Sequence, residues 1–267
     1  MTDDPELPRP SPKDEMWRAI LLGTTRASRN RRLHRRIPSS PRCKMCNAPF
    51  GGVGGLFMPL LGHARWAKNP KYCAGCFRML RENHGGAEIE CSLLFADVRG
   101  STALAEQMPP REFNRLMGWF FDVASEILVN HDAFVDKFVG DEIIGIFVPA
   151  MAGDAHAKQA VAAAMALMHQ TLPAKAGGRS IPIGAGVSTG IAYVGSIGTG
   201  ADTELTAMGD LVNTTARLAS AAAAGEILVT AAAATAAGMP GSLERRSLQL
   251  KGKSAPTDVS VLTVPGT

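Results

Sequence analysis

From residue 87 to the end of the chain, apolar runs of strand length alternate with amphipathic helical segments, and this alternation limits the possible folds more than any other feature. The first main segments follow the order strand, helix, strand, strand, helix, strand. That order favours an α+β sandwich in which helices pack on a largely antiparallel sheet. The predicted strands are residues 89–96, 133–138, 142–147, 181–187, 191–197, 227–230, 244–250 and 259–264, and the predicted helices are residues 102–107, 110–130, 154–171, 210–221 and 231–237.

Basic residues are concentrated at the front of the chain. The 267 residues carry a net charge of +4, but residues 1–88 hold 16 basic and 7 acidic side chains, whereas the remainder holds 12 and 17. A front of net charge +9 joined to a body of net charge −5 indicates two units with different partners. A basic unit favours phosphates, nucleic acid or an acidic protein surface.

Two of the front segments are defined by composition. Residues 1–13 contain four prolines and are predicted to be a disordered leader, and residues 14–42 are predicted to be a basic helix and linker, with a helical pattern that continues through Arg36. Seven arginines and no acid lie between Arg26 and Arg42. This run fits either a solvent-exposed helix face or a surface that docks on the acidic body or on a partner, and nucleic acid is the less favoured ligand.

Two C-x-x-C pairs, separated by 26 residues, mark residues 43–86 as a small zinc-ribbon-like module. Each pair brings two thiolates to one tight turn, and two such turns complete a tetrahedral site for structural zinc. An iron–sulfur cluster or reduced thiols remain alternatives. Cys91 is predicted to be a core residue, and His63 and His84 are predicted to be surface residues rather than ligands. The proposed ligands are Cys43, Cys46, Cys73 and Cys76.

No segment approaches the roughly 20 consecutive apolar residues of a membrane span. The first residues contain neither a basic segment nor an apolar segment of the kind found in signal peptides. We therefore expect a cytoplasmic protein with no membrane partner, in which thiols stay reduced.

Two aspartates lie where carboxylates are useful for chemistry. Asp97 ends the first apolar strand and is followed by small residues that leave backbone N–H groups free for an anion: Gly100, Ser101 and Thr102. Asp141 lies at the tip of the predicted hairpin, and in a ferredoxin-like sheet the hairpin neighbours the first strand. Two carboxylates beside a phosphate-binding turn can hold two divalent cations that neutralise a polyphosphate and activate an oxygen nucleophile.

Three sequence blocks then resemble the signature blocks of class III nucleotidyl cyclases: FADVRGST at residues 95–102, KFVGD at 137–141, and TAMGDLVNTTARL at 206–218. The resemblance runs from about Glu88 to Val264, in the family's order, and it implies that residues 87–267 form the catalytic domain. It implies a ferredoxin-like catalytic domain that converts ATP to 3′,5′-cyclic AMP and pyrophosphate, with two Mg²⁺ or Mn²⁺ ions per site.

The resemblance also implies a role for each matching residue. Asp97 and Asp141 would bind both metals, with help from the Val98 carbonyl, and Lys137 and Thr206 would contact adenine. Asn213 would orient the ribose, and Arg217 would stabilise charge on the α-phosphate; the two are four residues apart on one helix face. Lys251, or alternatively Lys253, would contact the outer phosphates. Family sites are shared between subunits, which implies a homodimer.

The identity of the base rests on two positions. Lys137 can donate to adenine N1, and the hydroxyl or backbone of Thr206 can meet the N6 amine, whereas a lysine would face a donor on guanine. Adenylate cyclase is therefore favoured, with guanylate cyclase as the near alternative. A diguanylate cyclase is disfavoured by the block that contains Asn213 and Arg217. A nucleic-acid-binding regulator with an inactive cyclase domain would require a broken catalytic set.

Overall fold

The computed structural model describes residues 11–24, 31, 33–34, 36–37, 39, 41–43, 45–67, 72–172, 180–199 and 203–264, without the side chain of Lys137. The first ten residues of the predicted leader and much of the arginine-rich segment lie outside these ranges. The chain divides into two compact units. Unit 1 comprises Met1–Glu88 together with Tyr193–Leu205, and unit 2 comprises Ile89–Ala192 together with Thr206–Thr267.

The strands of the described residues form an eight-stranded mixed sheet, and the first four have the predicted ferredoxin-like βαββαβ order. The strand order is β2-β3-β1-β4-β6-β8-β7, and β5 pairs with β4. The hairpin of β2 and β3 therefore lies directly beside β1, as predicted. The strands are β1 (Gly86–Val98), β2 (Phe134–Val139), β3 (Glu142–Phe147), β4 (Ile183–Ile197), β5 (Glu204–Met208), β6 (Glu226–Thr230), β7 (Arg245–Leu248) and β8 (Thr257–Thr263).

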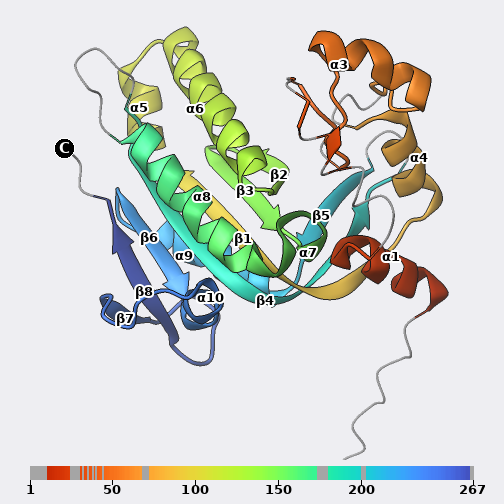
Figure 1. Ribbon diagram of the computed structural model, residues 1–267. Helices are drawn as coiled ribbons and strands as arrows, with labels where there is room; N and C mark the ends of the chain where they lie inside the picture. Colours follow the sequence, from red (N-terminus) through yellow and green to blue (C-terminus); the bar gives the residue numbers. More distant parts are fainter. Residues whose placement is uncertain are drawn as a thin grey trace, which may run out of the picture. The chain divides into compact units, whose positions relative to one another are not determined.

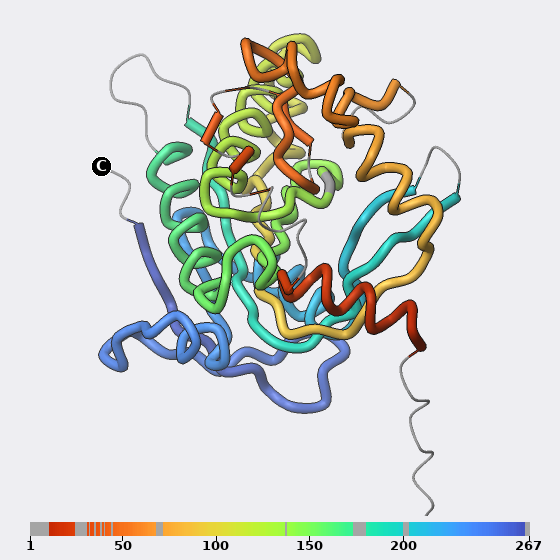
Figure 2. The backbone as a smooth tube through the Cα atoms, turned by 45° about the vertical axis from the view of Figure 1, so that its right-hand side comes forward, coloured from red at the N-terminus to blue at the C-terminus, as the bar shows by residue number. Residues whose placement is uncertain are grey.

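Two long helices of unit 2, α6 (Pro110–Asn130) and α8 (His156–Thr171), pack against each other over one face of the sheet (Figures 1 and 2). Their apolar faces and the sheet form one continuous core that includes the fully buried Phe120 and Phe147. α8 is rich in alanine, so it lies close to its neighbours. The shorter helices are α5 (Ser101–Gln107), α7 (Pro149–Ala152), η2 (Gly153–Ala155) and α10 (Ala231–Ala237).

The helix α9 (Asp210–Ala221) lies directly against β4 and β6. A side chain at Gly186 of β4 would come within 2.6 Å of the Thr215 carbonyl, so glycine permits the close approach of helix and strand. Leu218 and Ala222 pack with Leu228 in a second, smaller core cluster. This contact fixes the helix that carries two predicted site residues.

Two sequence predictions about the strands were wrong. Residues 181–187 and 191–197 form one continuous strand, β4, that runs through Gly190. A Cβ at Gly190 would lie 3.3 Å from Leu211 Cδ1, so the glycine leaves room for that side chain. β5 was not predicted at all, although it carries Thr206.

Unit 1 contains short helices around the cysteine pairs: α1 (Pro12–Leu22), α3 (Gly52–Phe57), η1 (Met58–Leu61) and α4 (Ala74–Glu82). The prediction that the first helix continues from Asp14 through Arg36 was wrong. α1 begins at a capping box formed by Ser11 and Asp14, and it ends at Gly23, whose φ of 80° is left-handed. The side chain of Trp17 is fully buried, and its indole N–H donates to the Asn83 carbonyl at 2.9 Å.

Two of the seven arginines have structural roles inside unit 1. Arg31 is 5% exposed and donates to the Met45 carbonyl at 2.6 Å. Arg42 donates to the carbonyls of His34, Asn47 and Ile37, and burial lowers its pKa. These guanidinium groups therefore hold backbone loops together and do not form part of an exposed docking face.

Candidate active site

Asp97, near the end of β1, and Asp141, in the turn between β2 and β3, lie at the same edge of the sheet in unit 2. Asp97 is the penultimate residue of β1 and pairs in register with Glu142 of β3, the residue that follows Asp141. The backbone N–H of Val98 donates to the Asp141 carbonyl at 3.4 Å. Gly140 adopts a left-handed φ of 63°, which closes the β2–β3 turn and places Asp141 at the sheet edge. The structure thus brings the two predicted metal-binding carboxylates together.

The electrostatics of this edge favour a cation. Burial raises the pKa of Asp97, and the charge of Asp141 raises it further, whereas Arg99 lowers it. Burial, followed by the charges of Asp97 and Asp141, raises the pKa of Glu142 to about 7. Three carboxyl groups of like charge share a half-buried edge, so a divalent cation would stabilise their ionised forms.

Arg99 is a residue of this site that the sequence analysis quoted but did not assign. Its guanidinium pairs with the Asp97 carboxylate. It also donates to the Ser220 carbonyl at 2.9 Å, near the end of α9. Arg99 therefore balances the charge of Asp97 and connects β1 to the helix that bears Asn213 and Arg217.

The predicted phosphate turn follows β1 directly. Gly100 adopts a left-handed φ of 71° and precedes the first residue of α5. Ser101 is half-buried and Thr102 is exposed. The turn is therefore present, with Gly100 in a conformation that glycine adopts without strain.

Asn213 and Arg217 lie on α9, one turn apart; Asn213 is exposed and Arg217 is half-buried. The Arg217 guanidinium lies against Gly252, where a Cβ would come within 3.3 Å of Nη2. Lys253 pairs with Asp210 at the start of α9. The turn that contains the two candidate lysines is thus next to the helix, with Lys251 exposed and Lys253 engaged by Asp210.

Thr206 is 2% exposed, and its hydroxyl donates to Asp136 Oδ2 at 2.6 Å. Asp136 is 4% exposed and precedes Lys137 on β2. The register of β2 against β3 shifts between Val135 and Phe138, which places a bulge at these two residues. Sequence analysis missed Asp136, because only the register shift and the position of β5 bring it to Thr206.

The four cysteines of the two pairs gather in unit 1, with their sulfur atoms within 4.8 Å of one another. Cys73 caps α4, and its backbone N–H donates to Cys43 Sγ at 3.2 Å. Asn47 closes the first turn with a left-handed φ of 56°. The four free thiols are buried or half-buried, as a closed tetrahedral metal site requires.

Thiol electrostatics also favour a metal here. Hydrogen bonds from neighbouring thiols, Cys43 and Cys46 first, lower the pKa of Cys73, whereas the same kind of contact raises the pKa of Cys46. Four adjacent thiolates repel one another unless a cation binds them. His63, predicted to be a surface residue, is half-buried, and its Nδ1 lies 3.3 Å from Cys73 Sγ, so it can orient that sulfur.

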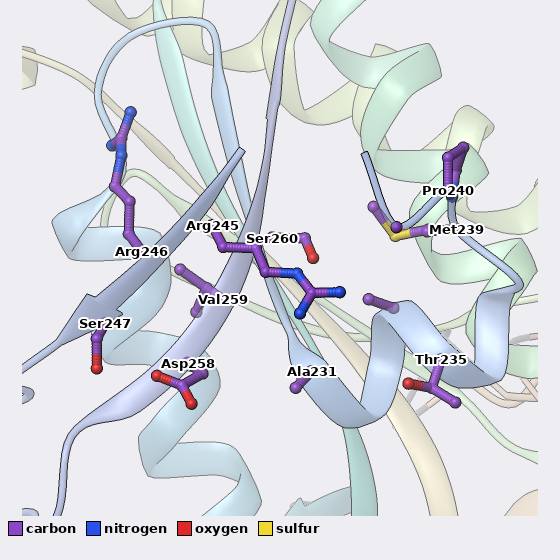
Figure 3. Close-up of a pocket in the computed structure, with 12 residues that line it drawn as sticks. Ala231, Thr235, Met239, Pro240, Arg245, Arg246, Ser247, Asp258, Val259 and Ser260 are labelled. Carbon is purple, nitrogen blue, oxygen red and sulfur yellow. The ribbon is translucent and has the colours of Figure 1, made fainter. Parts of the chain in front are cut away.

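A pocket of about 490 Å³ lies elsewhere in unit 2, between α10 and the β7–β8 pair. Figure 3 shows the side chains that line it, with Arg245 labelled among residues of β8 and α10. None of the predicted site residues is among those that line it. The chemistry predicted from the sequence is therefore not located in this pocket.

The sequence of residues 86–261 matches the family model described as the adenylate and guanylate cyclase catalytic domain. The chain belongs to this family of class III nucleotidyl cyclases. The cyclase is 30% identical to Adenylate cyclase 1 of Rhizobium meliloti (strain 1021) over 134 residues, which are 48% of this chain and 20% of that protein. It spans less than a third of the length of the curated relatives that it matches.

Two solved structures resemble the cyclase over most of their own length. The guanylyl cyclase Cya2 has a TM-score of 0.61 and 27% identity, covering 68% of this chain and 95% of that one. The adenylyl cyclase CyaB from P. aeruginosa has a TM-score of 0.59 and 26% identity, covering 67% and 97%. Across the described parts of the cyclase, no helix has the length and apolar character needed to cross a bilayer.

Proposed function

We propose that the protein is a cytoplasmic adenylate cyclase that converts ATP to 3′,5′-cyclic AMP and pyrophosphate. The observation that carries the proposal is the placement of Asp97, near the end of β1, beside Asp141 in the β2–β3 turn, together with Asn213 and Arg217 one turn apart on α9. Five free cysteines are consistent with a reducing compartment. Membership of the cyclase family supports the reaction class, and the choice of ATP rests on Thr206 and Lys137.

Asp97 and Asp141 fit a pair of Mg²⁺ or Mn²⁺ ions, because their carboxylates share an edge where burial and mutual repulsion disfavour two free charges. The ions would neutralise the triphosphate and lower the pKa of the attacking 3′-hydroxyl. Arg99 holds the Asp97 carboxylate in the same region. The turn at Gly100 would receive phosphate oxygens on its backbone N–H groups.

On the other part of the site, Asn213 would hold the ribose, and the Arg217 guanidinium would place fixed positive charge where negative charge grows on the α-phosphate. The contact with Gly252 and the pairing of Lys253 with Asp210 support Lys251 as the lysine that is exposed for the outer phosphates. Phosphoryl transfer depends mainly on such positioning and on fixed positive charge, which Arg217 and Lys251 would supply.

The test is an assay of cyclic AMP and cyclic GMP formation with Mn²⁺ or Mg²⁺. Wild type should use ATP in preference to GTP, and Asp97→Ala, Asp141→Ala and Arg217→Ala should each lower kcat by about 100-fold or more. Thermal unfolding of each variant should match wild type, since the three side chains lie outside the apolar core. Preferred turnover of GTP would make the enzyme a guanylate cyclase.

We further propose that the cyclase acts as a homodimer whose two sites each take Asp97 and Asp141 from one subunit and Asn213 and Arg217 from the other. Mixing inactive Asp97→Ala with inactive Arg217→Ala should restore about a quarter of wild-type activity, because half of the dimers would be mixed and each would hold one intact site. Mixed dimers that form but stay inactive would exclude shared sites.

Finally, we propose that residues 43–86 bind one structural zinc ion, and that this module regulates the domain at residues 87–267. The support is a hydrogen bond inside unit 1: the backbone N–H of Leu205, on β5, donates to the hydroxyl of Tyr72 at 3.2 Å. Tyr72 precedes the ligand Cys73, and Leu205 precedes Thr206. Metal analysis should find one zinc and no iron–sulfur absorption in anaerobically purified protein, and removing the zinc should change the KM for ATP.

A further inference from the structure

The buried pair of Asp136 and Thr206 restricts how Thr206 can hydrogen-bond to a purine. A threonine hydroxyl has one proton and two acceptor lone pairs. In the cyclase that proton is donated to Asp136 Oδ2 at 2.6 Å, a distance typical of a hydroxyl bound to an ionised carboxylate. Only lone pairs of the Thr206 oxygen then remain for any other partner.

We propose that Asp136 is a positioning residue that makes Thr206 an acceptor and thereby selects a purine with an amine at position 6. This inference rests on the proposed function, in which Thr206 meets the base. The exocyclic amine of adenine can donate to such an oxygen. The 6-oxo group of guanine is itself an acceptor, so it would face lone pairs and lose its hydrogen bond.

Burial makes this arrangement persistent. Asp136 is 4% exposed and Thr206 is 2% exposed. A hydroxyl that turned its proton toward a substrate would leave a buried carboxylate oxygen without that donor, which is costly in a low-dielectric environment. The proton should therefore stay on the Asp136 side when a nucleotide binds.

The backbone explains how a residue next to Lys137 reaches Thr206. In a regular strand, consecutive side chains point to opposite faces, so Asp136 and Lys137 would not serve one site. The register shift between Val135 and Phe138 inserts one extra residue into β2, and such a bulge redirects side chains. The bulge therefore accounts for the contact that Asp136 makes with Thr206.

The experiment is a mutant cycle read out as the ratio of kcat/KM for ATP to that for GTP. Asp136→Val removes the acceptor and frees the Thr206 proton to donate to a 6-oxo group, so the ratio should fall by about 10-fold to 100-fold. Thr206→Ser keeps the hydroxyl and should keep the ratio. Asp122→Val, on the exposed side of α6, is the matched control and should behave as wild type.

The cycle separates positioning from a merely structural role. If Asp136 acts through Thr206, Asp136→Val should leave the ratio unchanged in a Thr206→Val background, where no hydroxyl remains to orient. An unchanged ratio in a single variant whose thermal unfolding matches wild type, or an equal change in both backgrounds, would overturn the inference. Loss of folding alone would lower both kcat/KM values together and leave the ratio as it is.

Two further measurements cover the case in which Asp136→Val does not fold. Asp136→Asn is isosteric, and its neutral amide oxygen holds the Thr206 proton less strongly, so the ratio should fall by a few-fold. On wild type, purine riboside triphosphate keeps N1 but lacks the 6-amine, and its kcat/KM should be about 10-fold below that of ATP. Equal use of the two nucleotides would overturn the inference.

Failure of this inference differs from failure of the proposed function. If the enzyme makes cyclic AMP and its preference for ATP does not change in the Asp136 variants, the proposed function stands and the positioning role of Asp136 is wrong. A protein that forms no cyclic nucleotide from any triphosphate, with either metal, would reject the proposed function itself.

Discussion

The two units of the molecule are stabilised in different ways. Unit 2 has a continuous apolar core between its sheet and the helices α6 and α8. Unit 1 relies on four thiols, on Trp17, and on two arginines whose guanidinium groups bind backbone carbonyls. Several large apolar side chains of unit 1 are exposed, so the segment buries little surface, and we expect a bound metal and polar cross-links to supply much of its stability. The comparison predicts that metal removal and core truncation affect different units.

Loss of the metal site should have the largest effect. Cys73→Ala removes one of four ligands, and because metal binding supplies on the order of 10 kcal/mol in small zinc modules, unit 1 should lose its protection against hydrogen exchange. Peptides from α6 and α8 should keep theirs. Cys91→Ala, in β1, is the matched control and should leave the metal bound. If unit 1 of Cys73→Ala kept the hydrogen-exchange protection of wild type, the proposed difference between the two units would be wrong.

Truncation of a core side chain should instead destabilise unit 2 and leave unit 1 unaffected. Phe120 is fully buried, so Phe120→Ala should lower the free energy of unfolding of unit 2 by about 3–5 kcal/mol through lost burial and a cavity. Urea unfolding followed at α6 and α8 measures this, and the metal content should stay unchanged. Phe57→Ala, at a side chain that is 59% exposed in unit 1, should change stability by less than about 0.5 kcal/mol.

A polar cross-link of unit 1 should contribute less than the metal. Arg42→Met leaves three carbonyl acceptors without the guanidinium, which should destabilise unit 1 by about 2 kcal/mol. The measurement is the denaturant concentration at which the metal is released. Arg81→Met, on the exposed side of α4, is the control and should leave that concentration unchanged. If both variants shifted it equally, the loss of a positive charge, and not the loss of the contacts of Arg42, would explain the effect.

The smallest effect should be a pH dependence confined to unit 2. Burial lowers the pKa of His156, whose Nδ1 lies 2.8 Å from Ser92 Oγ and whose Nε2 faces Glu90 at 3.8 Å. The unfolded chain binds a proton below about pH 6.5 while the folded histidine stays neutral, so stability should fall as pH decreases through that value. His156→Gln should reduce this slope. A slope that persists in the variant would assign it to other groups.

The sequence was sufficient to predict features whose residues lie close together in the chain or belong to a recognisable motif. The hairpin beside β1, the helix that carries Asn213 and Arg217, and the grouping of the four cysteines all follow from local spacing. The contact between Thr206 and Asp136 was not predictable, because it depends on a bulge and on an unpredicted strand. Residues 181–187 and 191–197 were predicted as separate strands, but Gly190 continues the strand and leaves room for the side chain of Leu211.

The continuous strand β4 also bears on how such a protein could be assembled from parts. Its last residues belong to unit 1, where the Ser196 N–H donates to the Gly85 carbonyl at 2.8 Å and Gly86 packs on the backbone of Gly195. Cleaving the chain after Glu88 would leave the β4–β5 hairpin with bare hydrogen-bonding edges that promote aggregation. Recombination at one junction would therefore not transfer the cysteine-containing segment to another cyclase, because the recipient would also need a matching hairpin.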